Sequence, residues 1–184
     1  MYRIVTIKDI VAVPPERFGE DLESVIKDIL RETYEGILDK ELGVIILISN
    51  IKDIGIGKIA PGDGSAYHEV TFDALTFKPD MQEVLEGEVV EIVDFGAFVR
   101  LGPLDGLIHI SQIMEDYIVH DSKGGALIGK ETHKTLKEGD KVRARVVAVS
   151  LNPRELRESK IGLTMRQKGL GKIEWIKAEK EEKK

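Results

Sequence analysis

Hydrophobic and polar positions change their spacing twice in the first 80 residues. Residues 1–13 are rich in Ile and Val and predict a strand, which Pro14 and Pro15 end because neither can donate to a strand ladder. Apolar residues then recur every three or four positions, which predicts one long helix with a core-facing stripe. The members of this stripe are Leu22, Val25, Ile26, Ile29, Leu30, Thr33, Tyr34, Ile37 and Leu38. Gly43 follows the predicted end of the helix.

Two more strands follow this helix. Residues 44–48 are apolar on both faces, so we expect them to lie centrally in a sheet and to run on toward Ile59. Gly55 and Gly57 indicate bulges or a close backbone approach. Residues 67–77 alternate as a returning strand after a turn at 61–64. The order strand, helix, strand, strand predicts an α+β layer with the helix on one face.

Short alternating runs replace the long elements after residue 83. Runs at 87–93, 97–101, 107–111, 141–149 and 160–166 are separated by turns that contain glycine, and they predict a small antiparallel barrel. The aliphatic positions of the later runs should form the interior, because water exclusion drives them there. These positions are Ala97, Val99, Leu101, Ile108, Ile110, Val142, Ala144, Val146, Ala148, Ile161, Leu163 and Met165. Residues 112–138 interrupt the barrel and predict an inserted hairpin.

The same alternation places several aromatic and basic side chains outside the predicted barrel. Phe98, Arg100 and His109 face outward, with Phe95 at the entrance of the second strand. An exposed ring beside an imidazole and a cation is a platform for nucleic-acid bases and backbone. Four further cations share the outer surface: Arg143, Arg145, Lys160 and Arg166. The pattern is equally compatible with phenylalanines packed under loops and a histidine that caps a turn.

Composition narrows the possible classes of protein. The 184 residues are 42% hydrophobic and 33% charged, as in a globular protein, and no cysteine is present for disulfides or thiolate metal sites. The four histidines show no metal spacing, and no P-loop or nucleophile–base pair occurs, so we expect no cofactor and no catalysis. The early charges do not fit a signal peptide, and no stretch reaches membrane-spanning length, which predicts a cytoplasmic protein. A total of five Asn and Gln residues indicates a thermophile.

Charge is distributed unevenly along the chain. Residues 1–82 carry 9 Lys and Arg against 15 Asp and Glu, whereas residues 83–184 carry 18 of each. Nine basic residues lie within 141–172 beside Glu155 and Glu158 alone, which indicates a local face for a polyanion. The alternative is a solvated surface of mixed charge. The acidic first part has no basic stripe, so protein contact suits it better than nucleic acid.

The barrel strands contain specific sequence motifs. Three motifs resemble those of the S1 RNA-binding domain, a five-stranded OB-type barrel. They are Gly-x-Val at residue 87, Asp-Phe-Gly-Ala-Phe-Val at residue 94 and Asp-Gly-Leu-Ile-His-Ile-Ser at residue 105. That resemblance favours RNA contact for Phe95, Phe98 and His109. Two positions depart from the family pattern, because Ser150 and Lys160 stand where the family tends to carry Asp and Arg. Lysine lacks the planar fork of arginine, so we expect weak RNA binding with little sequence preference.

The whole chain, opening Met-Tyr-Arg-Ile, resembles the E-prime family of archaeal RNA polymerase stalk proteins. The resemblance implies a non-catalytic polymerase component that pairs with a small helical partner, the F subunit. Residues 1–82 would be a truncated RNP-like domain that docks on the polymerase core, and residues 83–168 an S1 barrel that meets single-stranded nascent RNA. Residues 169–184 would be a charged tail that frays, with Trp175 and Ile176 pinning its start. The alternative is an S1-domain accessory protein of RNA processing or translation, and a third interpretation is a purely structural bridge.

The tip of the predicted hairpin in the first domain is apolar and rich in glycine. With the family resemblance, it is expected to contact the polymerase core. The residues concerned are Gly57, Lys58, Ile59, Pro61, Gly62 and Asp63. The alternative is an ordinary glycine-rich turn.

Overall fold

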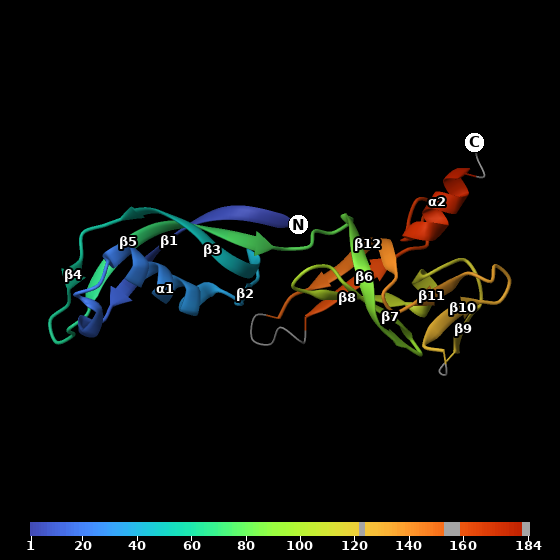
Figure 1. The fold of residues 1–184 in the computed structure, drawn as a ribbon, viewed down its shortest axis with the longest axis horizontal. Coiled ribbons are helices and arrows are strands. Elements are labelled where there is room, and N and C mark those ends of the chain that lie inside the picture. The colour runs from blue at the N-terminus through green and yellow to red at the C-terminus, as the bar shows by residue number, and fades with distance from the viewer. Residues whose placement is uncertain (122–123, 153–158, 182–184) are drawn as a thin grey trace. The chain divides into compact units, whose positions relative to one another are not determined.

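The structure is a computed structural model that describes residues 1–121, 124–152 and 159–181 (Figure 1). It divides into two compact units, Met1–Lys78 and Pro79–Lys184. Each unit has its own sheet and its own core, so each is described separately. Among the described residues, no helix is both long enough and apolar enough to cross a membrane.

The first unit is an antiparallel sheet with one helix. Its elements in chain order are β1 (Tyr2–Val13), a 3-10 turn (Pro15–Arg17), α1 (Leu22–Tyr34), β2 (Leu38–Asp39), β3 (Gly43–Ile54), β4 (Lys58–Ile59) and β5 (Ala66–Phe77). The strand order is β1-β5-β3-β2, and β4 pairs with β5. β1 and β5 pair along their full length, from Tyr2 opposite Phe77 to Val13 opposite Ala66. The expected order of elements is confirmed.

α1 covers one face of this sheet (Figure 1). The Asp21 side chain accepts a hydrogen bond from the Ser24 backbone N–H at 3.0 Å, which caps the first turn of the helix. Val25, Ile26 and Leu30 are fully buried. They form one hydrophobic core with residues of the strands, including Phe72. The predicted stripe therefore builds the core of this unit, because it meets the inner face of the sheet.

One expectation about the first unit is wrong, and another holds only in part. The helix ends at Tyr34, because Gly36 adopts a left-handed φ of 83° and its N–H donates to the Ile45 carbonyl at 2.8 Å. Ile37 is therefore 48% exposed rather than helical core. The strand with residues 44–48 lies inside the sheet, between β5 and β2, but β2 pairs only with its start, at Gly43 and Val44. Glu35 instead accepts the free Ile48 N–H, at 2.8 Å.

The close backbone approach predicted at the two glycines is confirmed. A Cβ on Gly57 would lie 2.7 Å from the His68 ring, and one on Gly55 would lie 3.1 Å from the Glu69 carbonyl oxygen. The bulges lie earlier in β3, where its register against β5 shifts at three places between residues 45 and 53. Alanine at position 57 would require the His68 ring to move, and alanine at position 55 would require a small shift away from the Glu69 carbonyl.

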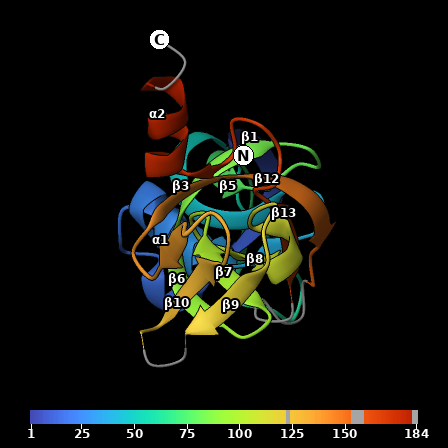
Figure 2. The same ribbon diagram turned by 90° about the vertical axis from the view of Figure 1, so that its right-hand side faces the viewer.

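The second unit contains a barrel, an inserted sheet and a C-terminal helix (Figure 2). Its elements are β6 (Val84–Val93), β7 (Gly96–Arg100), β8 (Asp105–His109), a 3-10 turn (Ile110–Gln112), β9 (Ile118–Asp121), β10 (Ala126–Gly129), β11 (Thr135–Lys137), β12 (Lys141–Ser150), β13 (Lys160–Thr164), β14 (Gly171–Lys172) and α2 (Ile173–Glu181). The strand order is β13-β8-β7-β6-β12-β14, and β12 also pairs with β13. This extra pairing closes five strands into the expected OB-type barrel.

The barrel interior follows the predicted alternation with two exceptions. Residues such as Val99, Ile108 and Val146 are fully buried. Ala148 is exposed instead, because the register between β12 and β13 shifts between Val146 and Ala148 and breaks the alternation. Ile110 is only half-buried, because β8 ends at His109 and the 3-10 turn begins there.

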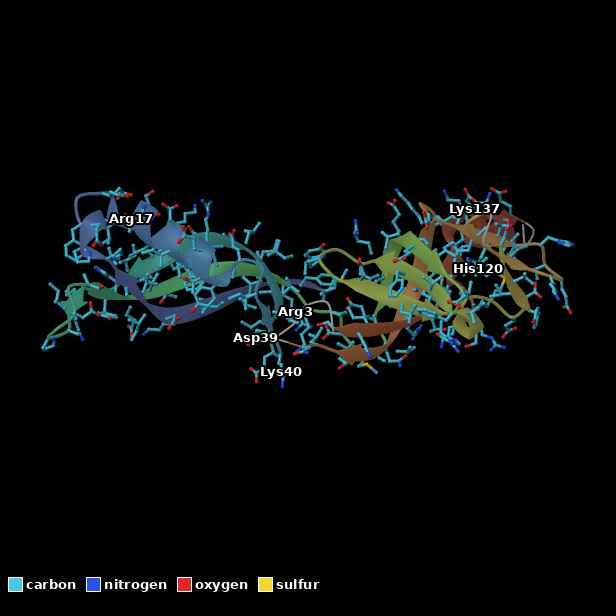
Figure 3. All side chains as sticks on the ribbon, turned by 90° about the horizontal axis from the view of Figure 1, so that it is seen from below. Arg3, Arg17, Asp39, Lys40, His120 and Lys137 are labelled. Carbon is cyan, nitrogen blue, oxygen red and sulfur yellow. The ribbon has the colours of Figure 1, made fainter. Side chains whose placement is uncertain are left out.

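The insertion is larger than the expected hairpin. β9 and β10 form that hairpin, and β11 adds a third strand on the other side of β10. Leu127 and Leu136 are fully buried and give this sheet a core of its own. His120 and Lys137, labelled in Figure 3, lie on its two outer strands. Two residues of the predicted turn, 122–123, lie outside the described residues.

The expectation of a fraying C-terminal tail is wrong for residues 171–181. Gly171 and Lys172 pair with β12, and α2 follows directly. Lys172 forms ion pairs with Asp140 at 3.0 Å and Glu174 at 2.9 Å. Ile176 is buried, so it anchors the helix as expected. Most of the extended loop expected at 151–159 lies outside the described residues.

Candidate nucleic-acid interface

The outer face of β7 and β8 brings together the aromatic, basic and imidazole side chains predicted for RNA contact. Phe98 pairs with Leu107, Gly96 with His109, and Arg100 with Asp105. Alternate residues of paired strands share a face, so Phe98, Arg100 and His109 lie on the same outer surface. A Cβ on Gly96 would lie 2.2 Å from the Ile108 carbonyl oxygen, so only glycine permits the close approach of the two strands here.

The two phenylalanines form an edge-to-face pair. Their ring centroids lie 6.3 Å apart, and the rings are inclined by 85°. Phe95 is 48% exposed and Phe98 is half-buried, so neither is a core residue. Phe98 also lines a hollow of about 340 Å³ beside Glu91, Asp105 and Ser159. The pair presents an accessible aromatic surface next to this hollow.

His109 both caps a turn and remains exposed. Its Nδ1 accepts a hydrogen bond from the Ser111 backbone N–H at 3.3 Å and lies 2.9 Å from the Ser111 hydroxyl oxygen. The alternative that His109 caps a turn is therefore correct, and Nδ1 is the capping atom. In the neutral ring this leaves the proton on Nε2, which has no hydrogen-bond partner among the described residues. The exposed ring keeps an N–H donor for a ligand.

Three of the predicted cations are exposed and at most weakly paired. Arg100 lies on β7 itself, and its Nε is 3.4 Å from Asp105, a long and exposed contact. Lys160 is exposed opposite Ser150 at the start of β13. Arg166 follows β13, and its Nε lies 3.8 Å from Glu115. Exposed pairs of this length are weak, so these side chains are available to phosphate.

The two arginines of β12 have different surroundings. Arg143 lies opposite Glu86 and donates from Nη2 to its carboxylate at 2.6 Å. Arg145 lies between Val84 of β6 and Thr164 of β13, and its Nε is buried without a hydrogen-bond partner among the described residues. A buried donor of this kind is costly unless an acceptor reaches it.

Sequence reasoning missed the carboxylate beside the aromatic pair. The register places Glu91 of β6 directly opposite Phe98, on the side away from Leu107. The signal lay in the short turn at 94–95, which joins the two strands and sets their register; alternation within one strand does not use it. The surface is therefore an aromatic centre with carboxylates and cations around it, not a uniformly basic patch.

The tip of the first unit is an ordered turn with an apolar surface. Lys58 and Ile59 pair with β5, and Gly62 adopts a left-handed φ of 86°. Asp63 accepts hydrogen bonds from the Tyr67 hydroxyl and from the Ser65 N–H, and the Tyr67 hydrogen bond is the main reason why the pKa of Asp63 is lowered. Ile59 is 66% exposed, and the adjoining Ile56 is 90% exposed. Among the described residues, no three His, Asp or Glu side chains converge as metal ligands.

Both units match known families. Residues 8–64 match the SHS2 domain found in the N terminus of Rpb7p/Rpc25p/MJ0397, and residues 78–160 match the S1 RNA binding domain. The expected RNP-like and S1 folds are therefore confirmed.

Some curated relatives match this chain over nearly its full length. It is 44% identical to "DNA-directed RNA polymerase subunit Rpo7" of Saccharolobus shibatae, over 96% of this chain and 97% of that protein. It is 27% identical to "DNA-directed RNA polymerase III subunit RPC8" of Saccharomyces cerevisiae, over 88% and 79% of the two chains. Ribonuclease R of Buchnera aphidicola is 41% identical over 40% of this chain and 10% of that protein, so the chain resembles only a small part of that enzyme. The chain belongs to the Rpo7 family of DNA-directed RNA polymerase subunits.

Proposed function

We propose that this polymerase component is a non-catalytic stalk protein of the cytoplasm. It pairs with the F subunit of RNA polymerase, docks on the polymerase core through the tip of its first unit, and binds single-stranded nascent RNA on the outer face of β7 and β8. The observation that carries the RNA assignment is the accessible Phe95–Phe98 pair on the face that also holds Arg100 and His109. The S1 match of residues 78–160 supports the same assignment.

The composition of this surface determines what it binds. Aromatic rings stack on any base, and each stacked base contributes about 1–3 kcal/mol with little sequence preference. Glu91 and Asp105 lie beside Phe98 and repel phosphate. Their negative charges offset part of the attraction between the surrounding cations and the RNA backbone. We therefore expect weak, salt-dependent binding of single strands, as the replacement of arginine by Lys160 also predicts.

Titration of a labelled oligonucleotide at two salt concentrations tests the RNA assignment. Phe98→Ala combined with His109→Ala should weaken binding by about one to two orders of magnitude, given the stacking contribution above. Phe18→Ala is a matched control, because Phe18 is a 51% exposed phenylalanine in the other unit. Equal affinities for the double variant and the control would show that RNA does not bind on this face.

Docking through the tip is supported by its exposed apolar side chains. Ile56 and Ile59 lie beside Pro61 in a domain of net negative charge, which suits a protein partner better than RNA. The Asp63–Tyr67 hydrogen bond holds the turn in shape without covering these side chains. A preorganised apolar turn loses little conformational freedom when it binds.

Pairing with the F subunit is supported by the open face of the first sheet. Ile4 lies opposite Leu75, which lies opposite Leu47, on the face away from α1. Ile4 is 70% exposed and Leu47 is 40% exposed. A partner that binds only the folded chain raises its melting temperature and makes it concentration-dependent. Melts of the chain with and without this partner test the pairing, and identical melting temperatures would contradict it.

A further inference from the structure

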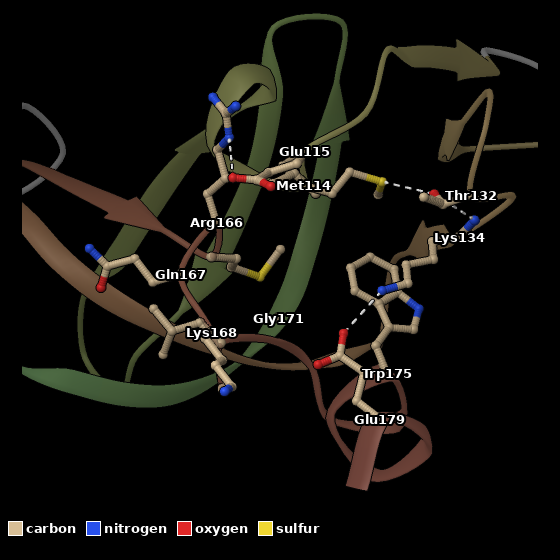
Figure 4. A pocket seen from close by; sticks show the side chains of 14 residues that line it. Met114, Glu115, Thr132, Lys134, Arg166, Gln167, Lys168, Gly171, Trp175 and Glu179 are labelled. Atoms are coloured by element: carbon tan, nitrogen blue, oxygen red, sulfur yellow. Dashed lines mark hydrogen bonds and ion pairs between the residues drawn. The ribbon is translucent and has the colours of Figure 1, made fainter. Parts of the chain in front are cut away.

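A second hollow of the barrel unit, about 440 Å³ in volume, lies apart from the aromatic pair (Figure 4). Its lining comes from three places: the segment that follows β13, the insertion with the residues before it, and α2. The side chains that matter here are Met114, Lys134, Arg166, Gln167, Lys168 and Trp175. Its volume is within the range of small-molecule sites, about 300–1,000 Å³, and is therefore sufficient for a nucleobase.

Trp175 provides an aromatic wall that is held in place. Its indole is half-buried and packs against the backbone at Gly171, where an added Cβ would lie 3.3 Å from the ring. The Lys134 Nζ lies 5.5 Å from the ring centroid and forms an ion pair with Glu179 at 3.3 Å (Figure 4). A ring fixed in this way stacks with a base at a low entropic cost.

The opposite part of the hollow is polar and cationic (Figure 4). Among the described residues, the Arg166 side chain pairs only with Glu115, at 3.8 Å, and the Glu115 side chain is 76% exposed. Lys168 makes no ion pair within the part of the chain that the structure describes. Gln167 adds an amide, which both donates and accepts hydrogen bonds and so matches a base edge. The ring and the amide together match a base, and the cations match a phosphate.

β13 and Gln112 connect this hollow to the proposed RNA-binding face. Leu163 pairs with Ile108, so Thr164 lies beside His109, and Arg166 follows two residues after the end of β13. Gln112 joins the two places: its side-chain oxygen accepts from the Thr164 hydroxyl at 2.9 Å, and its carbonyl accepts from the Met165 N–H at 2.8 Å.

We propose that the hollow is a second subsite for single-stranded RNA. A strand that passes His109 continues past Arg166, places a phosphate between Arg166 and Lys168, and stacks one base on Trp175. This inference rests on the proposed RNA-binding function and extends its footprint from the β7–β8 face to α2.

The chain offers a direct probe, because Trp175 is its only tryptophan. Tryptophan fluorescence of the full chain is followed while an unlabelled oligouridylate of about 12 nucleotides is added, a length within the site size of one OB fold. Total binding is measured in parallel with the same RNA carrying a label. A base stacked on the indole quenches the emission, and the quenching should saturate at the RNA concentration that saturates binding.

Substitutions at the cationic side distinguish direct contact from a distant effect. Arg166→Gln with Lys168→Gln should shift the quenching midpoint to about five- to tenfold higher RNA concentration at low salt, because two phosphate contacts are lost. Lys177→Gln is the control, since Lys177 is an exposed cation on α2 that does not line the hollow. Trp175→Phe should retain most of the binding, whereas Trp175→Ala should weaken it by about 5- to 140-fold, the equivalent of about 1–3 kcal/mol for one stacked base.

The outcomes separate this subsite from the proposed function. If labelled RNA binds while the emission of Trp175 stays constant, the subsite is refuted and the RNA-binding face stands. If quenching occurs but its midpoint is the same in the Arg166–Lys168 variant and the Lys177 control, the contact is indirect and the inference is also wrong. If labelled RNA does not bind at all, the proposed function itself fails.

Discussion

Arg143 and Glu86 face each other across the ladder of β12 and β6, and both Nε and Nη2 of Arg143 donate to the same carboxylate oxygen, at 3.0 and 2.6 Å. The sequence alone predicts Arg143 as a free cation for RNA. In the fold its charge is already paired, although the Glu86 side chain is 61% exposed. Glu86 therefore competes with phosphate for this arginine.

Glu86→Gln should release Arg143 and strengthen RNA binding by about 1.4- to fivefold at low salt, since exposed ion pairs contribute about 0.2–1 kcal/mol. Glu138→Gln removes the same charge from an exposed turn of the same unit and is the control. Fluorescence anisotropy with a labelled single strand measures the difference. An affinity gain of the same size in both variants would mean that net charge, not release of Arg143, is responsible.

The second prediction concerns the tip. Ile56→Ser combined with Ile59→Ser should abolish association with the polymerase core and leave the melting temperature within a few degrees of that of the parent chain, because both side chains are exposed, at 90% and 66%. Ile37→Ser is the matched control, an isoleucine 48% exposed outside the tip. Co-purification with the core measures the effect. Normal recovery of the core by the double variant would place docking elsewhere.

The third prediction tests the contact that shapes the RNA-binding face. Gly96→Ala should destabilise the second unit by about 1–3 kcal/mol, because its Cβ would lie 2.2 Å from the Ile108 carbonyl oxygen and force β7 away from β8. Gly19→Ala is the control, since no neighbouring atom lies within 4 Å of its added Cβ. Urea unfolding of both variants gives the comparison. Equal midpoints would show that the two strands separate without cost.

The fourth prediction is a dependence on alkaline pH. Burial, followed by the hydrogen bond to Asp9, raises the pKa of Tyr34 from 10.0 to about 12. A raised pKa contributes stability that is complete below pH 10 and is lost as the pH rises through about 12. The parent chain should therefore lose more stability than Tyr34→Phe over this interval. Urea midpoints below pH 10 and near pH 12 measure it, and parallel losses in the two proteins would contradict it.

Alternation predicted the barrel interior well, because a closed barrel buries one face of every strand. It failed where the backbone departs from regular geometry. The register shift after Val146 exposes Ala148, and the 3-10 turn after His109 moves Ile110 out of the interior. In the first unit, Gly36 ends α1 before the apolar stripe ends. These local conformations depend on tertiary hydrogen bonds, such as that from Gly36 to Ile45, which a one-dimensional pattern does not contain.

The candidate site was predicted residue by residue but not as an arrangement. Phe98 and His109 share a face because their strands are neighbours in the chain and joined by a short turn. The partner of Arg143 is 57 residues away, and the carboxylate opposite Phe98 is found only when the turn at 94–95 is used to set the register of β6 against β7. Trp175 was expected only to pin the start of a tail. Its role as the wall of a hollow depends on α2 and on Lys134, which come together only in the fold.

Crosslinking tests the central claim, RNA contact on the β7–β8 face, most directly. A single strand that carries photoreactive 4-thiouridine is bound to the complete polymerase assembled with this chain, irradiated, and digested, and the crosslinked peptides are identified by mass spectrometry. We expect crosslinks in the segment that contains Phe95 and Phe98 and in the segment that contains His109. Crosslinks confined to the first unit, or to the β6 and β12 strands that hold Glu86 and Arg143, would contradict the assignment.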